Sequence, residues 1–265
     1  MPGLSAVSLD EMRTVRFLGY PFFAGTLEEL RAIVEEAVRE GRKLHIMTVN
    51  PEMLAVRDRG FHTILERAEI RLPDGIGVVW GARLLRCGRL LRRPGIEVAE
   101  ALMEWGQERG WRFYFLGARE PVVAQAVEKV LRRYPGLCVC GFHHGYFEDD
   151  AEVLADVVSA APNVLFVGMG VPRQEVWIAR YRDVLPAQVF MGVGGSFDVW
   201  AGRLRRAPLP FRFLGLEWLW RVLREPRRVR RVVPAFARFG MLLMREWWRK
   251  GWYNTSRVQG NNGIS

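Results

Sequence analysis

The sequence predicts an α/β domain in which helices cover both faces of a mainly parallel sheet, followed by a C-terminal helical, basic appendage. Three observations lead to this prediction. Short apolar runs alternate with stretches of helical periodicity over residues 27–193. Glycines and polar side chains gather where these runs end, and parallel sheets bind ligands at such ends. From about residue 203 the alternation gives way to arginine-rich segments that contain proline.

The first helix is predicted from a capping box formed by Thr26 and Glu29 and from apolar residues at helical spacing that stop at Gly41. A second helix-like stretch begins near Met53. Further helices are expected over about 97–109, 121–133, 151–160 and 173–184. The apolar runs between the helices predict strands over 44–49, 69–72, 111–116, 137–142, 163–167 and 187–193. We expect residues 1–202 to form this α/β domain.

The C-terminal segment is expected to be helical over 214–224 and 227–252, with Pro234 breaking or kinking the second run near residue 233. Residues 203–255 are therefore predicted to form a helical appendage. Residues 256–265 are polar and contain glycine, so we expect them to be a disordered tail.

The positive charge of the chain is confined to this C-terminal part. The formal net charge is +10, but residues 1–202 carry 24 basic and 26 acidic side chains, whereas residues 203–265 carry 15 and 3 and five of the ten tryptophans. Such a composition is typical of a segment at an anionic membrane surface. An RNA-binding protein with a basic arm is an alternative. Because the α/β domain is slightly acidic and contains no nucleic-acid motif, we expect no nucleic-acid partner.

Cysteine usage and hydropathy indicate a cytoplasmic protein. Cys87, Cys138 and Cys140 are an odd number of cysteines, which favours a reducing compartment over a disulfide framework. No N-terminal apolar run fits a signal peptide, and no stretch of about 18 apolar residues predicts a spanning helix. We therefore expect a cytoplasmic protein that is peripheral on the inner face of the cell membrane.

Two glycine-rich loops at strand ends predict a site for a nucleotide. Gly168 and Gly170 follow one expected strand and precede a helix, whose first N–H groups favour an anion. Gly192 and Gly194 end the next strand and precede Asp198, a side chain able to accept a hydrogen bond from a ribose or a base. Two such loops on adjacent strands favour ligand binding over a purely structural role.

Other interpretations of these residues remain open. A nicotinamide-dependent oxidoreductase is an alternative, although Arg173 occupies the position of the third glycine in a dinucleotide fingerprint and no acidic residue ends the next strand. Asp198 is also explained as a cap of a helix terminus. His45 lies inside an apolar strand, where we expect a hydrogen-bonded core residue.

A candidate general base follows another strand. Asp74 stands in a turn-forming Leu-Pro-Asp-Gly sequence, close to the strand end that carries Thr48 and Asn50. A carboxylate beside an acceptor hydroxyl is what proton abstraction requires. The acidic run Glu148-Asp149-Asp150 directly precedes a helix and complements its dipole, so we interpret it as capping and expect no metal site.

An arginine cluster surrounds Glu225-Pro226 in the appendage. A solvated basic face is the simplest interpretation of such a run. Leucine and tryptophan alternate with these arginines, however, and guanidinium groups beside apolar surface suit a lipid-linked diphosphate. The members are Arg221, Arg224, Arg227, Arg228, Arg230 and Arg231.

Several short motifs occur in order over about residues 15–250, and together they are specific. They are Thr48-Val-Asn50-Pro51-Glu52, Pro73-Asp74-Gly75-Ile-Gly77, Arg92-Arg93-Pro94-Gly95-Ile96-Glu97, Phe115-Leu116-Gly117, Gly168-Met-Gly170-Val-Pro172-Arg173-Gln174-Glu175, Gly192-Val-Gly194-Gly-Ser-Phe-Asp198, Arg206-Ala-Pro208, Leu216-Glu-Trp-Leu219 and Glu225-Pro226-Arg227-Arg228. In these motifs the chain resembles the WecG/TagA/CpsF family of bacterial glycosyltransferases.

The resemblance implies a Rossmann-like, inverting, metal-independent hexosyltransferase without a cofactor. Its donor would be a UDP-sugar, with N-acetylmannosamine the sugar in the best-known branch. Its acceptor would be N-acetylglucosaminyl-diphospho-undecaprenol, a polyprenyl-diphosphate-linked precursor of teichoic acid or other surface polysaccharides. Self-association into a homo-oligomer is also implied.

The same resemblance assigns roles to individual residues. Asp74 would be the general base, with Thr48 and Asn50 beside it. The residues expected at the UDP-sugar are Gly117, Gly168, Gly170, Arg173, Gln174, Gly192, Gly194 and Asp198. The residues expected at the acceptor diphosphate are Arg92, Arg221, Arg224, Arg228 and Arg231.

Overall fold

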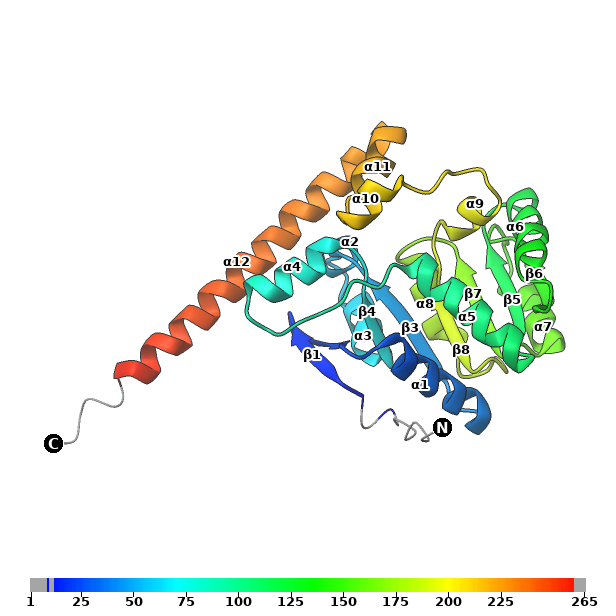
Figure 1. Cartoon of the computed structure of the whole chain (residues 1–265), viewed down its shortest axis with the longest axis horizontal. Coiled ribbons are helices and arrows are strands. Elements are labelled where there is room, and N and C mark those ends of the chain that lie inside the picture. Colours follow the sequence, from blue (N-terminus) through cyan, green and yellow to red (C-terminus); the bar gives the residue numbers. More distant parts are fainter. Residues whose placement is uncertain (1–8, 10–11, 260–265) are drawn as a thin grey trace.

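The computed structural model describes Leu9 and residues 12–259, with side chains through residue 249, and contains a six-stranded parallel sheet (Figure 1). The strands lie in the order β4-β3-β8-β7-β5-β6, and every neighbouring pair is parallel. The predicted parallel sheet is thus confirmed. The strands are β3 (Leu44–Val49), β4 (Ile70–Pro73), β5 (Arg112–Gly117), β6 (Cys138–His143), β7 (Val164–Gly168) and β8 (Val189–Gly192).

Helices cover both faces of the sheet, as predicted. α1 (Leu27–Glu40), α5 (Gly95–Arg109) and α6 (Glu120–Arg133) contribute to the core on one face. α7 (Asp150–Ala160) and α8 (Arg173–Tyr181) contribute to the core on the other. The remaining helices of this part are α2 (Pro51–Leu54), α3 (Arg59–Arg67), α4 (Ile76–Leu84) and α9 (Ser196–Trp200).

Successive residues of β5 point to opposite faces of the sheet. Phe113 and Phe115 belong to the core under α1, α5 and α6, whereas Tyr114 and Leu116 belong to the core under α7 and α8. All four side chains are fully buried. Because both faces are covered, such a strand is a continuous apolar run without alternation, and this is why the strands were predictable from the sequence.

The sequence prediction omits several elements, α9 among them, and for two of them the reason is plain. An N-terminal hairpin joins β1 (Thr14–Phe17) and β2 (Tyr20–Phe23) and buries Phe17 and Phe22. Its strands have four residues each, too few for a clear alternation. The other element is α4, whose residues are mostly apolar all around the helix, so helical periodicity does not mark it.

The appendage consists of α10 (Leu209–Phe213), α11 (Glu217–Arg224), a 3₁₀ turn (Pro226–Arg228) and α12 (Val229–Gln259). α12 continues through Pro234 without a break, and the kink predicted as the other outcome stays a prediction. Pro234 lies near the start of α12, where its missing N–H removes a single helical hydrogen bond. The helix includes the first four residues of the tail expected to be disordered, and 260–265 lie outside the described residues. None of the described helices is long and apolar enough to cross a bilayer.

α12 lies along the α/β domain and buries one side there (Figure 1). Ala235 and Phe239 are buried, and the ring of Phe239 meets Phe17 edge-on at 6.4 Å. α4 lies beside α12 at Gly81, where a Cβ atom would come within 2.8 Å of the Phe17 ring and 3.1 Å of Leu243. The absence of a side chain at Gly81 therefore permits α4, the hairpin and α12 to pack together.

Replacing Gly81 by alanine should destabilise the fold by about 1–3 kcal/mol, because the new methyl group overpacks this contact. Gly240→Ala is the matched control. Gly240 lies in α12, and a methyl group added there would meet no neighbouring atom within 4 Å, so alanine should stabilise the helix by about 0.5–1 kcal/mol. Urea unfolding of both variants measures the difference. Equal stabilities would contradict the packing of α12 described here.

Candidate active site

A cavity of about 480 Å³ lies at the carboxyl ends of β3, β4 and β8, between the α/β domain and helices α11 and α12. Its walls come from segments that are far apart in the sequence. The predicted site residues that line it are Thr48, Asn50, Asp74, Arg92, Gly170, Gln174, Gly192, Gly194, Arg221, Arg228 and Arg231. The sheet topology and the appendage thus bring most of the predicted site together.

Thr48 and Asn50 lie at the end of β3, as predicted. The side-chain oxygen of Asn50 accepts the N–H of Met53 at 3.1 Å and caps α2, which fixes its orientation. Thr48 faces the first turn of α5, where a Cβ atom on Gly95 would lie 2.8 Å from Thr48 Oγ1. Glycine at this position allows the positive end of the α5 dipole to approach the cavity.

Asp74 follows β4 and lines the cavity. Its backbone N–H donates to the carbonyl of Val49 at 2.8 Å, which holds it beside the end of β3. Burial raises the pKa of the Asp74 carboxyl group to about 6, and the negative charge of Glu217 adds to the rise. Arg221 and a hydrogen bond from the backbone of Gly95 oppose it. The carboxyl group is therefore able to accept a proton near neutral pH.

Gln174 ties the two glycine loops together. Its side-chain oxygen accepts the N–H groups of Gly170 at 3.1 Å and Gly194 at 3.0 Å, and its amide nitrogen donates to Glu175 at 2.9 Å. Gly192 leaves room for this buried side chain, since a Cβ atom there would lie 2.3 Å from Gln174 Nε2. The N–H groups of Gly170 and Gly194 are thus bonded within the protein.

A buried carboxylate and imidazole continue this network. Glu175 Oε2 lies 2.8 Å from His45 Nε2, and both side chains are buried. The prediction that His45 is a hydrogen-bonded core residue is confirmed. Sequence reasoning missed the role of Glu175, because its partner lies 130 positions away in the chain. The available signal was a Gln-Glu pair at the start of a helix that follows a glycine loop.

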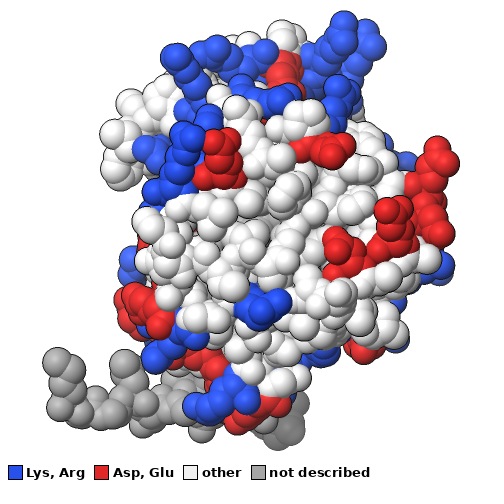
Figure 2. Space-filling model, turned by 90° about the vertical axis from the view of Figure 1, so that its right-hand side faces the viewer, with Lys and Arg blue, Asp and Glu red and all other residues white. Residues whose placement is uncertain are grey.

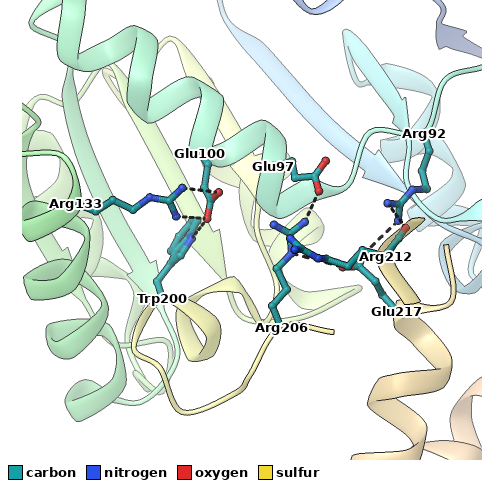
Figure 3. A network of polar contacts seen from close by, with 8 residues as sticks. All are labelled: Arg92, Glu97, Glu100, Arg133, Trp200, Arg206, Arg212 and Glu217. Atoms are coloured by element: carbon teal, nitrogen blue, oxygen red, sulfur yellow. Dashed lines mark hydrogen bonds and ion pairs between the residues drawn. The ribbon is translucent and has the colours of Figure 1, made fainter. Parts of the chain in front are cut away.

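Glu217, at the start of α11, links the appendage to the α/β domain (Figure 3). Its carboxylate lies 3.3 Å from the Arg92 guanidinium and 3.6 Å from that of Arg206. Arg206 also pairs with Glu97 on α5, and Arg92 donates to the carbonyl of Arg212 at 2.8 Å. Glu217 was not predicted as a site residue, because its partner Arg92 lies 125 positions earlier.

A second cavity of about 350 Å³ adjoins the first and shares Ile96, Glu217 and Arg221 with it. Arg224 lines this second cavity and lies over the ring of Trp220 at 4.9 Å. Lys and Arg side chains gather over the end of the molecule that carries α10 and α11 (Figure 2). The combined site therefore joins a carboxylate with several arginines and the aromatic ring of Trp220.

The glycosyl transferase WecG/TagA/CpsF family model matches residues 15–252, which is most of the chain. The chain belongs to this family. The resemblance drawn from the short motifs is thereby confirmed.

Curated members of the WecG/TagA/CpsF family align with this chain over about three quarters of their length. A Bacillus spizizenii protein is 37% identical over 190 residues, which cover 71% of this chain and 74% of the relative. A Bacillus subtilis protein is 36% identical over 196 residues, 72% and 77% of the two chains. A Staphylococcus aureus protein is 35% identical over 198 residues, 73% and 78%. Each is named N-acetylglucosaminyldiphosphoundecaprenol N-acetyl-beta-D-mannosaminyltransferase.

Some residues predicted for this family's donor site do not line the first cavity. Gly117 and Gly168 bring two strand ends together, since a Cβ atom on Gly117 would lie 2.4 Å from the Gly168 carbonyl oxygen. The Arg173 guanidinium lies over the ring of Phe147, 5.6 Å from its centroid. Packing accounts for glycine at both positions, and Arg173 contacts Phe147. A contact between these three residues and the donor stays a prediction.

Asp198 lines neither cavity. Its backbone carbonyl accepts the N–H groups of Arg203 at 2.9 Å and Leu204 at 3.0 Å, which turns the chain from α9 toward the appendage. Burial raises the pKa of the Asp198 carboxyl group, and the nearby Arg203 guanidinium opposes the rise. A contact between Asp198 and the donor stays a prediction.

Within the described part of the chain, no three His, Cys, Asp or Glu side chains gather as ligands for a metal ion. The acidic run before α7 acts as a cap: Asp149 accepts the N–H of Ala151 at 2.9 Å, and Asp150 accepts from Trp177 and Tyr181. The capping interpretation of this run is confirmed. A metal-independent reaction stays a prediction.

Asp74→Asn should stabilise the fold at pH 7 by up to about 3 kcal/mol, the equivalent of a rise of about two units in the pKa of Asp74. The folded protein binds the Asp74 proton more tightly than the unfolded chain, so this group's contribution to stability falls as pH rises from about 4 to about 6. Asparagine does not ionise, so the variant does not lose this stability as the pH rises. Thermal unfolding should show that the stability of the variant relative to the native chain increases across this pH range. Asp183→Asn, at an exposed residue, is the control and should show no such increase. Parallel curves for Asp74→Asn and the native chain would contradict the raised pKa.

Proposed function

We propose that this chain is an inverting hexosyltransferase that moves N-acetylmannosamine from a UDP-sugar to N-acetylglucosaminyl-diphospho-undecaprenol. The observation that carries the proposal is the Asp74 carboxyl group, with its pKa near 6, in a cavity rimmed by arginines. The names of the aligned relatives support the acceptor and the sugar. The product would be a precursor of teichoic acid or another surface polysaccharide.

The proposed reaction is a single displacement. Asp74 takes the proton from an acceptor sugar hydroxyl while that oxygen attacks the anomeric carbon of the donor. The bond from the anomeric carbon to the UDP oxygen breaks, and UDP leaves with its electron pair, so the configuration inverts. Thr48 and Asn50 lie in the same cavity and would orient the two sugars.

Arginines would neutralise the departing diphosphate without a metal ion. Arg221, Arg228 and Arg231 line the cavity from the appendage, and Arg92 lines it from the α/β domain. Guanidinium groups bind phosphate oxygens in pairs and remain charged at any physiological pH. Because the N–H groups of Gly170 and Gly194 are occupied by Gln174, the arginines are the main source of positive charge for this task.

The protein would act as a peripheral enzyme on the inner face of the cell membrane. The outward side of α12 supports this location, since Met241, Met244, Trp247 and Trp248 are each more than half exposed. Arginine and tryptophan on one helix favour the interface between lipid and water. Neither the oxidoreductase nor the RNA-binding alternative finds support in the family, and the implied homo-oligomer stays a prediction.

Asp74→Asn should lower transfer by about 10²–10⁴-fold, because the hydroxyl of the acceptor loses its base. UDP affinity should stay within a few-fold, since the proposed diphosphate contacts are arginines. Transfer to a lipid-diphosphate acceptor and calorimetric titration with UDP measure the two effects. Substantial turnover in the variant would exclude Asp74 as the base, and a panel of UDP-sugars in the same assay would identify the donor.

Glu217→Gln should move the acid limb of the kcat/KM profile to lower pH. In the native protein this limb should lie near pH 6, where Asp74 becomes protonated. Removing the negative charge at Glu217 lowers the pKa of Asp74, so the base stays ionised in more acidic solution. Glu246→Gln, which removes a carboxylate paired with Arg249 on α12, is the control and should leave the limb in place. Acid limbs at the same pH in both variants would contradict the effect of the Glu217 charge on the pKa of Asp74.

A further inference from the structure

The α/β domain carries a basic, apolar segment of its own. Residues 75–96 contain five arginines and no aspartate or glutamate, although residues 1–202 as a whole are slightly acidic. α4 exposes Trp80 and Leu84, with 69% and 63% of each residue accessible, and the loop after it exposes Leu91. Arg83, Arg86 and Arg89 are exposed between these apolar side chains. Neither the fold nor the cavity explains why large apolar groups lie uncovered here.

This segment lies beside α12. Figure 1 shows α4 alongside α12. Gly81, which is in the same helix turn as Trp80 and Leu84, approaches the Leu243 side chain, and Gly77 approaches Phe239. The two helices meet at the side of α12 that faces the α/β domain, so the exposed residues of α4 border the exposed residues of α12. Two segments more than 140 positions apart thus contribute to one surface.

The exposed part of α12 divides into an apolar strip and a basic strip. A helix turns by about 100° per residue, which places five exposed residues on one side of α12. This apolar strip consists of Val233, Ala237, Met241, Met244 and Trp248. The basic strip consists of Arg231, Arg238, Arg245 and Arg249.

The two strips have different neighbours. Arg231 pairs with Glu52 of α2 at 2.9 Å, so the basic strip lies on the α2 side. Leu243 approaches Gly81 of α4, and the exposed Trp247, four residues later, lies on the same side of α12, next to the apolar strip. The apolar strip of α12 is therefore the part that continues into Trp80 and Leu84.

The chemistry of this joint surface fits an anionic bilayer. Tryptophan and methionine would enter the region between headgroups and acyl chains, and arginine would reach the lipid phosphates. A second copy of this chain is a poorer occupant. In a two-fold dimer the same surface faces itself, and residues 75–96 would then oppose their own arginines without a carboxylate between them.

We propose that α4 and the loop after it form, together with the exposed side of α12, one surface that seats the enzyme on an anionic bilayer. Both helices also contribute to the cavity, α4 through Ile76 and Gly77 and α12 through Arg231 and Val232. Seating both helices places the cavity at the level of the headgroups, where a lipid-linked diphosphate lies. The inference rests on the proposed function only for the identity of that acceptor.

The test removes the apolar contribution of α4 from the full chain. Trp80→Ser combined with Leu84→Ser should weaken binding to vesicles of phosphatidylglycerol and phosphatidylethanolamine by at least about tenfold in sedimentation assays. The matched control combines Leu131→Ser with Val158→Ser, two exposed apolar residues on α6 and α7, and should bind like the native chain. Arg83→Ser, Arg86→Ser and Arg89→Ser together should reduce the preference for these vesicles over phosphatidylcholine vesicles, and the arginines of α12 should retain the remainder.

Activity separates this proposal from the proposed function. The Trp80/Leu84 variant should transfer sugar normally to a short-chain, water-soluble acceptor and lose at least about tenfold with a vesicle-embedded one. Native vesicle binding by this variant would overturn the proposal. If this variant binds vesicles like the native chain but no longer self-associates in light scattering, the surface belongs to a second copy of the chain, and the proposal is overturned as well. A native chain that binds vesicles but transfers to neither acceptor would refute the proposed function and leave the membrane surface standing.

Discussion

The charge of Asp74 is the constraint around which this site is built. Placing a carboxylate in a cavity raises its free energy unless dipoles and opposite charges surround it. The α/β domain supplies the backbone of Gly95 at the start of α5, and the appendage supplies Arg221. Burial remains the largest influence on Asp74, and the negative charge of Glu217 from the appendage adds to it, so that the pKa lies near 6. A base with useful strength at neutral pH thus depends on both parts of the chain.

A second constraint comes from the carboxyl edge of the sheet, where loops with free N–H groups meet. The side-chain oxygen of Gln174 accepts hydrogen bonds from two of these groups. Its amide nitrogen donates to Glu175, which in turn bonds to His45. These bonds fix the shape of the two loops and occupy the N–H groups of Gly170 and Gly194. The positive charge that the proposed diphosphate would meet therefore comes mainly from side chains, and most of the arginines at the cavity belong to α11 and α12 or the turn between them. The appendage completes the site chemically as well as sterically.

The fold was predictable where local pattern determines structure. Strands covered on both faces are continuous apolar runs, and the capping box at Thr26 fixes the start of α1. The site was predictable only in part, because its motifs locate the ends of strands but do not show which distant residues pack against them. Gly168 packs between strands and loops while Gly170 lines the cavity, a difference that two identical residues in one loop do not reveal. Glu217 and α4 were missed for related reasons: ion pairs across 125 positions and a helix apolar all around leave no local periodicity.

The proposed mechanism depends above all on Asp74 titrating near neutral pH in the native protein. An infrared difference spectrum between the native chain and Asp74→Asn, recorded across a pH titration, observes this carboxyl group itself. We expect a single carboxyl band in that difference, with a midpoint near pH 6. A midpoint near 4, the ordinary value for an exposed aspartate, would show that the cavity leaves Asp74 too weak a base for the proposed role.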